Sequence, residues 1–186
     1  MLRVYNYDSY EKYVEDQTAA NKKKIHWEFK KENHVQWIKS KKLGASNIIC
    51  HGTRNGGEQK VFKKYYPDAY IIGTEISETA NQFDMTVQHD FTKQKSQWIA
   101  KFDILYSNAF DHSFEPVETI KTWKEQLSYS GKMFIEWSGK YGQESTQTDP
   151  VSGTVQQVMD FLISQGVVIE EFNNEFGLLM CSVKNN

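Results

Sequence analysis

The sequence predicts an α/β protein whose mostly parallel sheet is covered by helices on both faces and ends in an antiparallel β-hairpin. Short apolar runs alternate with helical segments from residue 47 onward, which is typical of parallel strands joined by helical crossovers. The last two apolar runs, 166–173 and 177–183, are too close together for a helix between them, so we expect them to pair as a hairpin.

Length and composition indicate one domain. A chain of 186 residues can bury a sizeable core, and a net charge of −2 gives no general attraction to nucleic acid or anionic membranes. Cys50 and Cys181 lie far apart in predicted strands, so we expect buried thiols and no disulfide framework. The chain shows no signal-peptide core and no membrane-length apolar stretch, so we expect a soluble cytoplasmic protein with no membrane partner.

Residues 1–43 are predicted to form a helical extension of this single domain, with two helices interrupted near residues 29–33. Asp8 or Ser9 is the candidate cap of the first helix. Eight lysines lie between residues 22 and 42, and they form either a solvated helical face or a lid that attracts an anionic substrate.

Residues 44–186 are predicted to form the sheet and its covering helices. The last helix has apolar side chains at the 3, 4, 7, 8 spacing of a buried helical face. The expected strands lie near residues 47–51, 70–74, 85–89, 102–107, 132–137, 166–173 and 177–183. The expected helices lie near residues 56–65, 115–127 and 153–165, with shorter ones near 77–82 and 94–100.

The segment Asn47–Gln59, NIICHGTRNGGEQ, has the pattern of a strand, a Gly-rich turn and a helix. Glycines let the backbone approach a ligand closely, and the helix N-terminus offers unpaired N–H groups. Glu75 ends the next predicted strand, nineteen positions after Gly56. An acid at this distance is placed to accept hydrogen bonds from ribose hydroxyls, so the sequence predicts a nucleoside-cofactor enzyme.

The order of these motifs resembles that of the class I S-adenosylmethionine-dependent methyltransferases from about Asn47 to the C-terminus. The resemblance implies a seven-stranded Rossmann-like methyltransferase sheet, S-adenosyl-L-methionine as the cofactor, and residues 1–43 as a lid. Cys50 stands where the family usually has an acid, and Arg54 replaces the middle glycine of the turn. The lid residues expected to close over the methionine end are Gln17, Asn21 and His26.

The resemblance also implies roles in cofactor binding. Asp90 in VQHDF would contact the adenine amino group, with Phe91 beside the ring. Arg54 would pair with the cofactor carboxylate or with a neighbouring acid. His51 would lie under the cofactor or be a buried core histidine. The full set of expected cofactor residues is His51, Gly52, Thr53, Arg54, Gly56, Glu75, Ile76, Asp90, Phe91, Ser107 and Asn108.

The segment FDILYSNAFDHSFEP resembles the motif that carries an acid–His pair in small-molecule methyltransferases, here Asp111 and His112. Histidine exchanges protons near neutral pH, so His112 is the candidate base, and Asp111 either orients it or acts alone; alternatively, His112 does not touch the substrate. Glu136 is a candidate base, a ligand of sugar hydroxyls or a plain loop acid. Trp137 and Tyr141 would stack on the substrate unless their loop is an ordinary surface loop.

The resemblance, together with these candidate residues, implies an O-methyltransferase that acts on a sugar, a glycan or another small hydroxyl acceptor. The turn CHGTRNGGEQ also resembles that of short enzymes from viral and bacterial glycan-modifying gene sets, which favours sugar O-methylation and, for a virus, the host cytoplasm. The histidine and cysteine spacing predicts no metal site, although a divalent ion held by Asp111, Glu136 or Asp149 with sugar hydroxyls stays open.

Three other functions stay open. A nucleic-acid methyltransferase is supported only by the lysines of residues 22–42, so nucleic acid is not the expected partner. A non-catalytic domain that binds cofactor or a partner is suggested by Cys50 and Arg54. A nicotinamide dehydrogenase is a weaker fourth hypothesis, because the chain lacks G-x-G-x-x-G.

Overall fold

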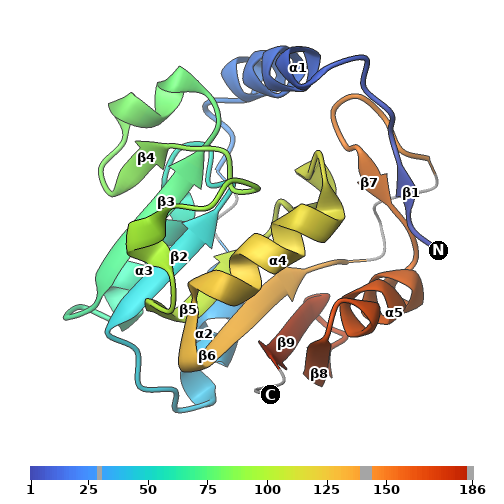
Figure 1. Ribbon diagram of the computed structural model, residues 1–186. Coiled ribbons are helices and arrows are strands. Elements are labelled where there is room, and N and C mark those ends of the chain that lie inside the picture. Colours follow the sequence, from blue (N-terminus) through green and yellow to red (C-terminus); the bar gives the residue numbers. More distant parts are fainter. Residues whose placement is uncertain (29–30, 139–143, 184–186) are drawn as a thin grey trace.

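The computed structural model describes residues 1–28, 31–138 and 144–183, which form a seven-stranded sheet in the order β4-β3-β2-β5-β6-β9-β8 (Figure 1). Strands β2 to β6 are mutually parallel, whereas β9 is antiparallel to both β6 and β8. The predicted sheet and its C-terminal hairpin are therefore confirmed. The strands are β2 (Asn47–His51), β3 (Tyr70–Glu75), β4 (Thr86–Gln88), β5 (Phe102–Ser107), β6 (Leu127–Glu136), β8 (Val167–Asn173) and β9 (Leu178–Val183).

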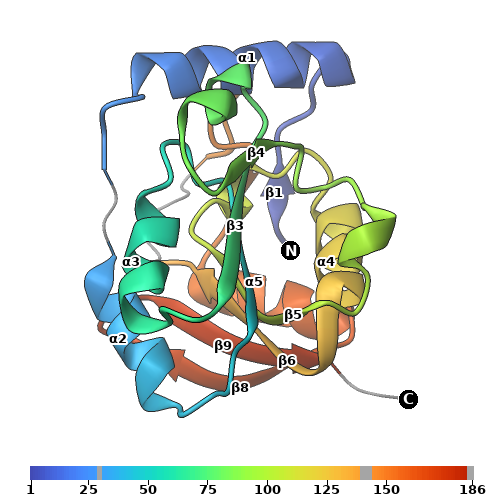
Figure 2. The ribbon, with the colours of Figure 1, turned by 90° about the vertical axis from the view of Figure 1, so that its left-hand side faces the viewer.

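Helices cover both faces of the sheet, as predicted. In Figure 2, α2 (Glu32–Ser40) and α3 (Gly57–Tyr65) lie on the left of the sheet, and α4 (Pro116–Gln126) lies on the right. Successive strand residues point to opposite faces, so Ile48 packs with α2 and α3 whereas Ile49 packs with α4 and α5. This double burial explains why the strands read as continuous apolar runs. The last helix, α5, spans Val155–Ser164.

The N-terminal segment crosses the end of the sheet at which the parallel strands finish. Helix α1 (Tyr10–Lys23) lies over this end in both views (Figures 1 and 2). Ser9 is its cap, because the Ser9 side chain accepts a hydrogen bond from the backbone N–H of Lys12. Before the helix, β1 (Arg3–Val4) pairs with β7 (Val151–Ser152), a contact that two-residue strands do not reveal in sequence.

Some elements differ from the predictions. The short helices expected near residues 77–82 and 94–100 are 3₁₀ turns, η1 (Glu78–Gln82) and η2 (Ser96–Trp98), and a third turn, η3, spans Phe110–His112. Strand β6 begins at Leu127 rather than near residue 132, because the buried Leu127 is followed by Ser128, Tyr129 and Ser130, which are not buried and carry no apolar run. Both cysteines are buried free thiols, as expected. Within the described residues, every helix is too short or too polar to cross a lipid bilayer.

A substitution in β3 tests the packing below the Gly-rich turn. A Cβ on Gly73 would lie 1.7 Å from Gln59 Nε2 and 2.7 Å from Thr53 Oγ1. We expect Gly73→Ala to displace the buried Gln59 amide and to lower the free energy of unfolding by about 1–3 kcal/mol. Gly44→Ala is the control, since a Cβ there has no atom within 4 Å. Urea denaturation compares the two variants, and equal midpoints would contradict the prediction.

Candidate functional site

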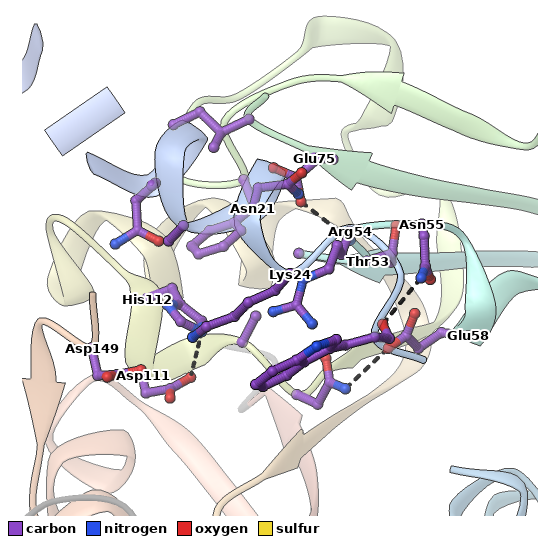
Figure 3. Close-up of a pocket in the computed structure, with 18 of the residues that line it drawn as sticks. Asn21, Lys24, Thr53, Arg54, Asn55, Glu58, Glu75, Asp111, His112 and Asp149 are labelled. Carbon is purple, nitrogen blue, oxygen red and sulfur yellow. Dashed lines mark hydrogen bonds and ion pairs between the residues drawn. The ribbon is translucent and has the colours of Figure 1, made fainter. Parts of the chain in front are cut away.

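A pocket lies under α1 at the carboxyl ends of the parallel strands. Strand β2 pairs with β3 on one side and β5 on the other, so the crossovers leave it in opposite directions and open a crevice between their loops. Side chains from α1 and from the carboxyl ends of β2 to β6 line the pocket (Figure 3). The predicted residues that it brings together are Gly52, Thr53, Arg54, Glu75, Ile76, Asp90, Phe91, Asn108, Asp111, His112 and Glu136.

The Gly-rich turn needs its glycines for close approach. Gly52 has φ +72°, and a Cβ there would lie 2.4 Å from Ala109 Cβ. Gly56 has φ 75° and is the N-cap of α3, so it shapes the turn without lining the pocket. The buried Gln59 amide holds the turn to the sheet, because its Nε2 donates to Thr53 Oγ1 at 2.9 Å and to Thr86 Oγ1 at 3.1 Å.

Glu75 lies at the tip of β3 with its carboxylate at the pocket (Figure 3). Its Oε2 accepts a hydrogen bond from the backbone N–H of Arg54 at 3.1 Å, and its Oε1 accepts one from Ser77 at 2.9 Å. Glu75 is only 7% exposed, and this burial raises the pKa of its carboxyl. The two backbone hydrogen bonds favour the ionised form and oppose that shift. The group is thus oriented by backbone from both sides.

After β3 and β4, the pocket is lined by Asp90 and by the apolar side chains of Ile76 and Phe91. Asp90 Oδ1 accepts from the backbone N–H of Thr92 at 2.8 Å, and its Oδ2 accepts from the Tyr10 hydroxyl of α1 at 2.8 Å. Ile76 and Phe91 line the same region and offer apolar surface to a flat ring. Tyr10 therefore connects α1 to this end of the pocket, a contact the sequence did not predict.

His112 has a defined tautomer. Its Nδ1 lies 2.6 Å from the Thr148 carbonyl oxygen, which can only accept a hydrogen bond, so Nδ1 carries the proton and Nε2 has a lone pair. Nε2 lies 3.9 Å from Asp111 Oδ1. Burial raises the pKa of Asp111, the positive charge of a protonated His112 would lower it, and Asp149 raises it further.

Asp111, His112 and Asp149 form one cluster on the side of the pocket away from Glu58 (Figure 3). One ligand atom from each of the three lies within 4.8 Å of the others, an arrangement that can hold a divalent cation as well as accept a proton. The histidine and cysteine spacing predicted no metal site, but Asp111 and Asp149 of this cluster are two of the acids for which a divalent ion was left open.

Glu136 ends β6 and lines the pocket, where Lys31 of the N-terminal segment forms an ion pair with it. Lys31 Nζ donates to Glu136 Oε1 at 2.8 Å, and His34 Nδ1 lies 3.9 Å from Oε2. Burial raises the pKa of Glu136, and the Lys31 ammonium opposes that shift. The ion pair makes this acid a weak candidate for proton abstraction.

Comparison with known proteins identifies the architecture. No family model matches the sequence, and neither does any curated protein sequence. Solved structures match it. The 1,6-didemethyltoxoflavin N1-methyltransferase of Burkholderia thailandensis has a TM-score of 0.70 at 10% identity, covering 95% of this chain and 89% of that one. The chain has the class I methyltransferase fold.

Two further structures agree with this methyltransferase fold. A SAM-dependent methyltransferase from Aquifex aeolicus has a TM-score of 0.65 at 12% identity, covering 88% of this chain and 96% of that one. The sugar N-methyltransferase KedS8 from Streptoalloteichus has a TM-score of 0.63 at 11% identity, covering 84% of this chain and 88% of that one. The [4+2]-cyclase SpnF also matches, with a TM-score of 0.63 at 11% identity, so the fold alone does not specify the reaction.

Two residues that the methyltransferase resemblance assigned to the cofactor lie behind the pocket instead. His51 is fully buried, with Nδ1 2.9 Å from Thr74 Oγ1 and Nε2 2.8 Å from Gln126 Oε1. Burial lowers the pKa of His51 to about 3, so it is a neutral core histidine. Ser107 is also buried, and its hydroxyl donates to the His51 carbonyl and accepts from the Ala109 N–H.

The substrate-stacking assignment of Trp137 needs correction. Trp137 is 1% exposed, its Nε1 donates to the Gly153 carbonyl at 3.0 Å, and its ring packs against Phe110. A ring in the core has no free face for a substrate. Tyr141 lies outside the described residues.

The N-terminal segment supplies a wall of the pocket. Gln17 and Asn21 line the pocket, whereas His26 does not. Asn55 of the Gly-rich turn holds the end of this segment, because its Nδ2 donates to the carbonyls of Ile25 and Trp27 at 3.0 Å each.

Glu58 is the pocket acid that the sequence reasoning missed. It lies in the first turn of α3 and is only 7% exposed. Its carboxyl accepts a hydrogen bond from Asn108 Nδ2 at 3.0 Å. Burial raises the pKa of Glu58 to about 7. Its place directly after a Gly-rich turn was the available signal, since side chains of that first turn border the same crevice.

The raised pKa of Glu58 predicts a pH-dependent cost to stability. The pKa is about 7 in the folded protein against an ordinary 4.5, so between these values the folded state binds more protons and stability falls as pH rises. Glu58→Gln removes this effect. We expect its free energy of unfolding to gain roughly 3 kcal/mol over wild type between about pH 4.5 and about pH 8.

Urea denaturation at several pH values measures this gain. Glu171→Gln is the control, because Glu171 is exposed and pairs with Lys41 far from the pocket. A stability difference between Glu58→Gln and wild type that does not change with pH would contradict the prediction.

Proposed function

We propose that the protein binds S-adenosyl-L-methionine in this pocket and transfers its methyl group to a hydroxyl of a sugar, a glycan or another small molecule. The observation that carries the proposal is the Glu75 carboxylate, which two backbone amides orient at the tip of β3 beside the Gly-rich turn. Two adjacent ribose hydroxyls would each donate to such a carboxylate.

The remaining lining fits the same cofactor. Gly52 permits close approach of the backbone, and Ile76 and Phe91 enclose a flat base. Asp90 retains acceptor capacity for an amino group, because each carboxylate oxygen has two lone pairs. The described lining has six Asp or Glu side chains against three Lys or Arg, which suits a cationic sulfonium. When bound, this cofactor supplies an activated methyl group, and its sulfonium becomes a neutral thioether on transfer.

His112 is the proposed base. A hydroxyl acceptor must lose its proton as the new O–C bond forms, and His112 Nε2 has the lone pair that receives it. The Thr148 carbonyl holds the ring, and Asp111 stabilises the imidazolium that results. Glu136 is assigned to binding an acceptor hydroxyl, because Lys31 already neutralises it.

A small acceptor is favoured over a nucleic acid. Three lysines of the N-terminal segment, Lys22, Lys31 and Lys41, form ion pairs with acids in different parts of the fold. Their charges are therefore locally neutralised rather than gathered into a surface for phosphates. Similar structures include both N-methyltransferases and O-methyltransferases, so the preference for oxygen rests on the His112–Asp111 pair.

The proposed function is tested by transfer of labelled methyl from S-adenosylmethionine to a panel of sugars, nucleotide sugars and phenols, with RNA and DNA as comparison substrates. The assay is run with Mg²⁺ and with EDTA, because Asp111, His112 and Asp149 can hold a cation. We expect labelled product from a small hydroxyl compound. Label only on nucleic acid, or on no acceptor, would contradict the proposal.

Loss of the ribose-binding carboxylate should weaken cofactor binding. Glu75→Ala removes a charged acceptor worth ~1.5–3 kcal/mol, so we expect S-adenosylhomocysteine to bind about 10- to 100-fold more weakly. Titration calorimetry measures the change, and Glu171→Ala is the exposed control. Unchanged affinity in Glu75→Ala would show that the ribose does not lie at β3.

Loss of the base should slow transfer without weakening cofactor binding. His112→Asn keeps a side-chain donor for the Thr148 carbonyl but cannot accept the proton, so we expect kcat to fall about 10²- to 10⁴-fold. S-adenosylhomocysteine affinity should stay within about twofold. A variant with wild-type kcat would remove His112 from the chemistry.

A further inference from the structure

Glu58 is a buried acid at the pocket to which the proposed chemistry assigns no role. Its carboxyl faces the cavity from the first turn of α3, and Asn108, from the loop after β5, donates to its Oε1 at 3.0 Å. Figure 3 shows Glu58 across the pocket from Asp111 and His112. This carboxyl accepts hydrogen bonds from its own backbone N–H and from Asn108, and it lines the pocket.

The order of the strands places Glu58 relative to a bound nucleoside. Asp90 and Phe91 follow β4, Glu75 ends β3, and Glu58 and Asn108 follow β2 and β5. In the sheet these strands lie side by side in the order β4-β3-β2-β5. A base at Asp90 and a ribose at Glu75 therefore direct whatever extends from the ribose toward Glu58.

We propose that Glu58 forms the subsite for the α-ammonium group at the methionine end of the cofactor, with Asn108 as the residue that positions the carboxylate. This inference rests on the proposed function, and it adds a recognition element for the amino-acid part of the ligand. The ammonium would donate a charge-assisted hydrogen bond to a Glu58 oxygen.

The electrostatics of Glu58 agree with a cationic occupant. Burial and the charge of Glu136 raise the pKa of Glu58 to about 7, although its backbone hydrogen bond, the Asn108 hydrogen bond and the charge of Arg54 favour the ionised form. A buried carboxyl that is poorly compensated gains most from a ligand that brings a positive charge. Its position in the first turn of α3 also favours the anion once it forms.

Comparing the binding of two ligands tests this subsite independently of the nucleoside part of the pocket. S-adenosylhomocysteine carries the amino-acid end, whereas 5′-methylthioadenosine has the same base, ribose and thioether without it. Glu58→Gln keeps the shape of the side chain and an oxygen that accepts from Asn108, but it removes the charge. Titration calorimetry then measures both ligands on wild type, on Glu58→Gln and on the exposed control Glu171→Gln.

We expect Glu58→Gln to bind S-adenosylhomocysteine about 10- to 100-fold more weakly and methylthioadenosine within about twofold of wild type. Retained methylthioadenosine binding also shows that the variant is folded around the nucleoside. An equal loss for both ligands, or no loss for either, would overturn the subsite. Failure of wild type to bind either ligand would overturn the proposed function and the subsite with it.

Proton release gives a second readout that a structural role would not move. If the ammonium binds ionised Glu58, wild type releases protons on binding S-adenosylhomocysteine at a pH somewhat below neutral, and calorimetry in buffers of different ionisation enthalpy detects them. Glu58→Gln should release fewer. Unchanged S-adenosylhomocysteine affinity with a large loss of kcat would instead make Glu58 a base and overturn the ammonium assignment.

Discussion

The two backbone hydrogen bonds to the Glu75 carboxylate are the contact on which the pocket depends. One donor, the N–H of Arg54, belongs to the Gly-rich turn after β2, and the other, the N–H of Ser77, follows β3. A single buried side chain thereby fixes the separation of two neighbouring loops. The turn can reach this carboxylate because Gly52 and Gly56 adopt left-handed backbone conformations.

The pocket concentrates buried acids whose ionisation is opposed by their surroundings. Burial raises the pKa of Glu58, Glu75, Asp111 and Glu136, and each shift means that the folded state holds the charged form at some cost in stability. The two apolar clusters on the faces of the sheet supply the compensating burial. Buried acids with raised pKa values around one cavity are typical of a functional site, where the charges of a ligand can stabilise their ionised forms.

Sequence patterns located the sheet and most of the pocket because both depend on local signals. Periodic apolar runs mark the strands, and the ends of β2 and β3 carry the turn and Glu75. Contacts between distant segments left no such signal: the pairing of β1 with β7, and the approach of Asp149 to His112. Trp137 was misplaced because its position just beyond β6 does not say whether the ring turns to the loop or to the core.

Helix α1 contacts both ends of the pocket. The Tyr10 hydroxyl donates to Asp90, and the Tyr13 hydroxyl donates to the His112 carbonyl at 3.1 Å. The residues that would recognise the nucleoside base and those that would receive the proton are thus bridged by the same helix. A change in α1 would therefore act on both ends of the pocket at once, so the extension belongs in any comparison of pocket shape among proteins of this architecture.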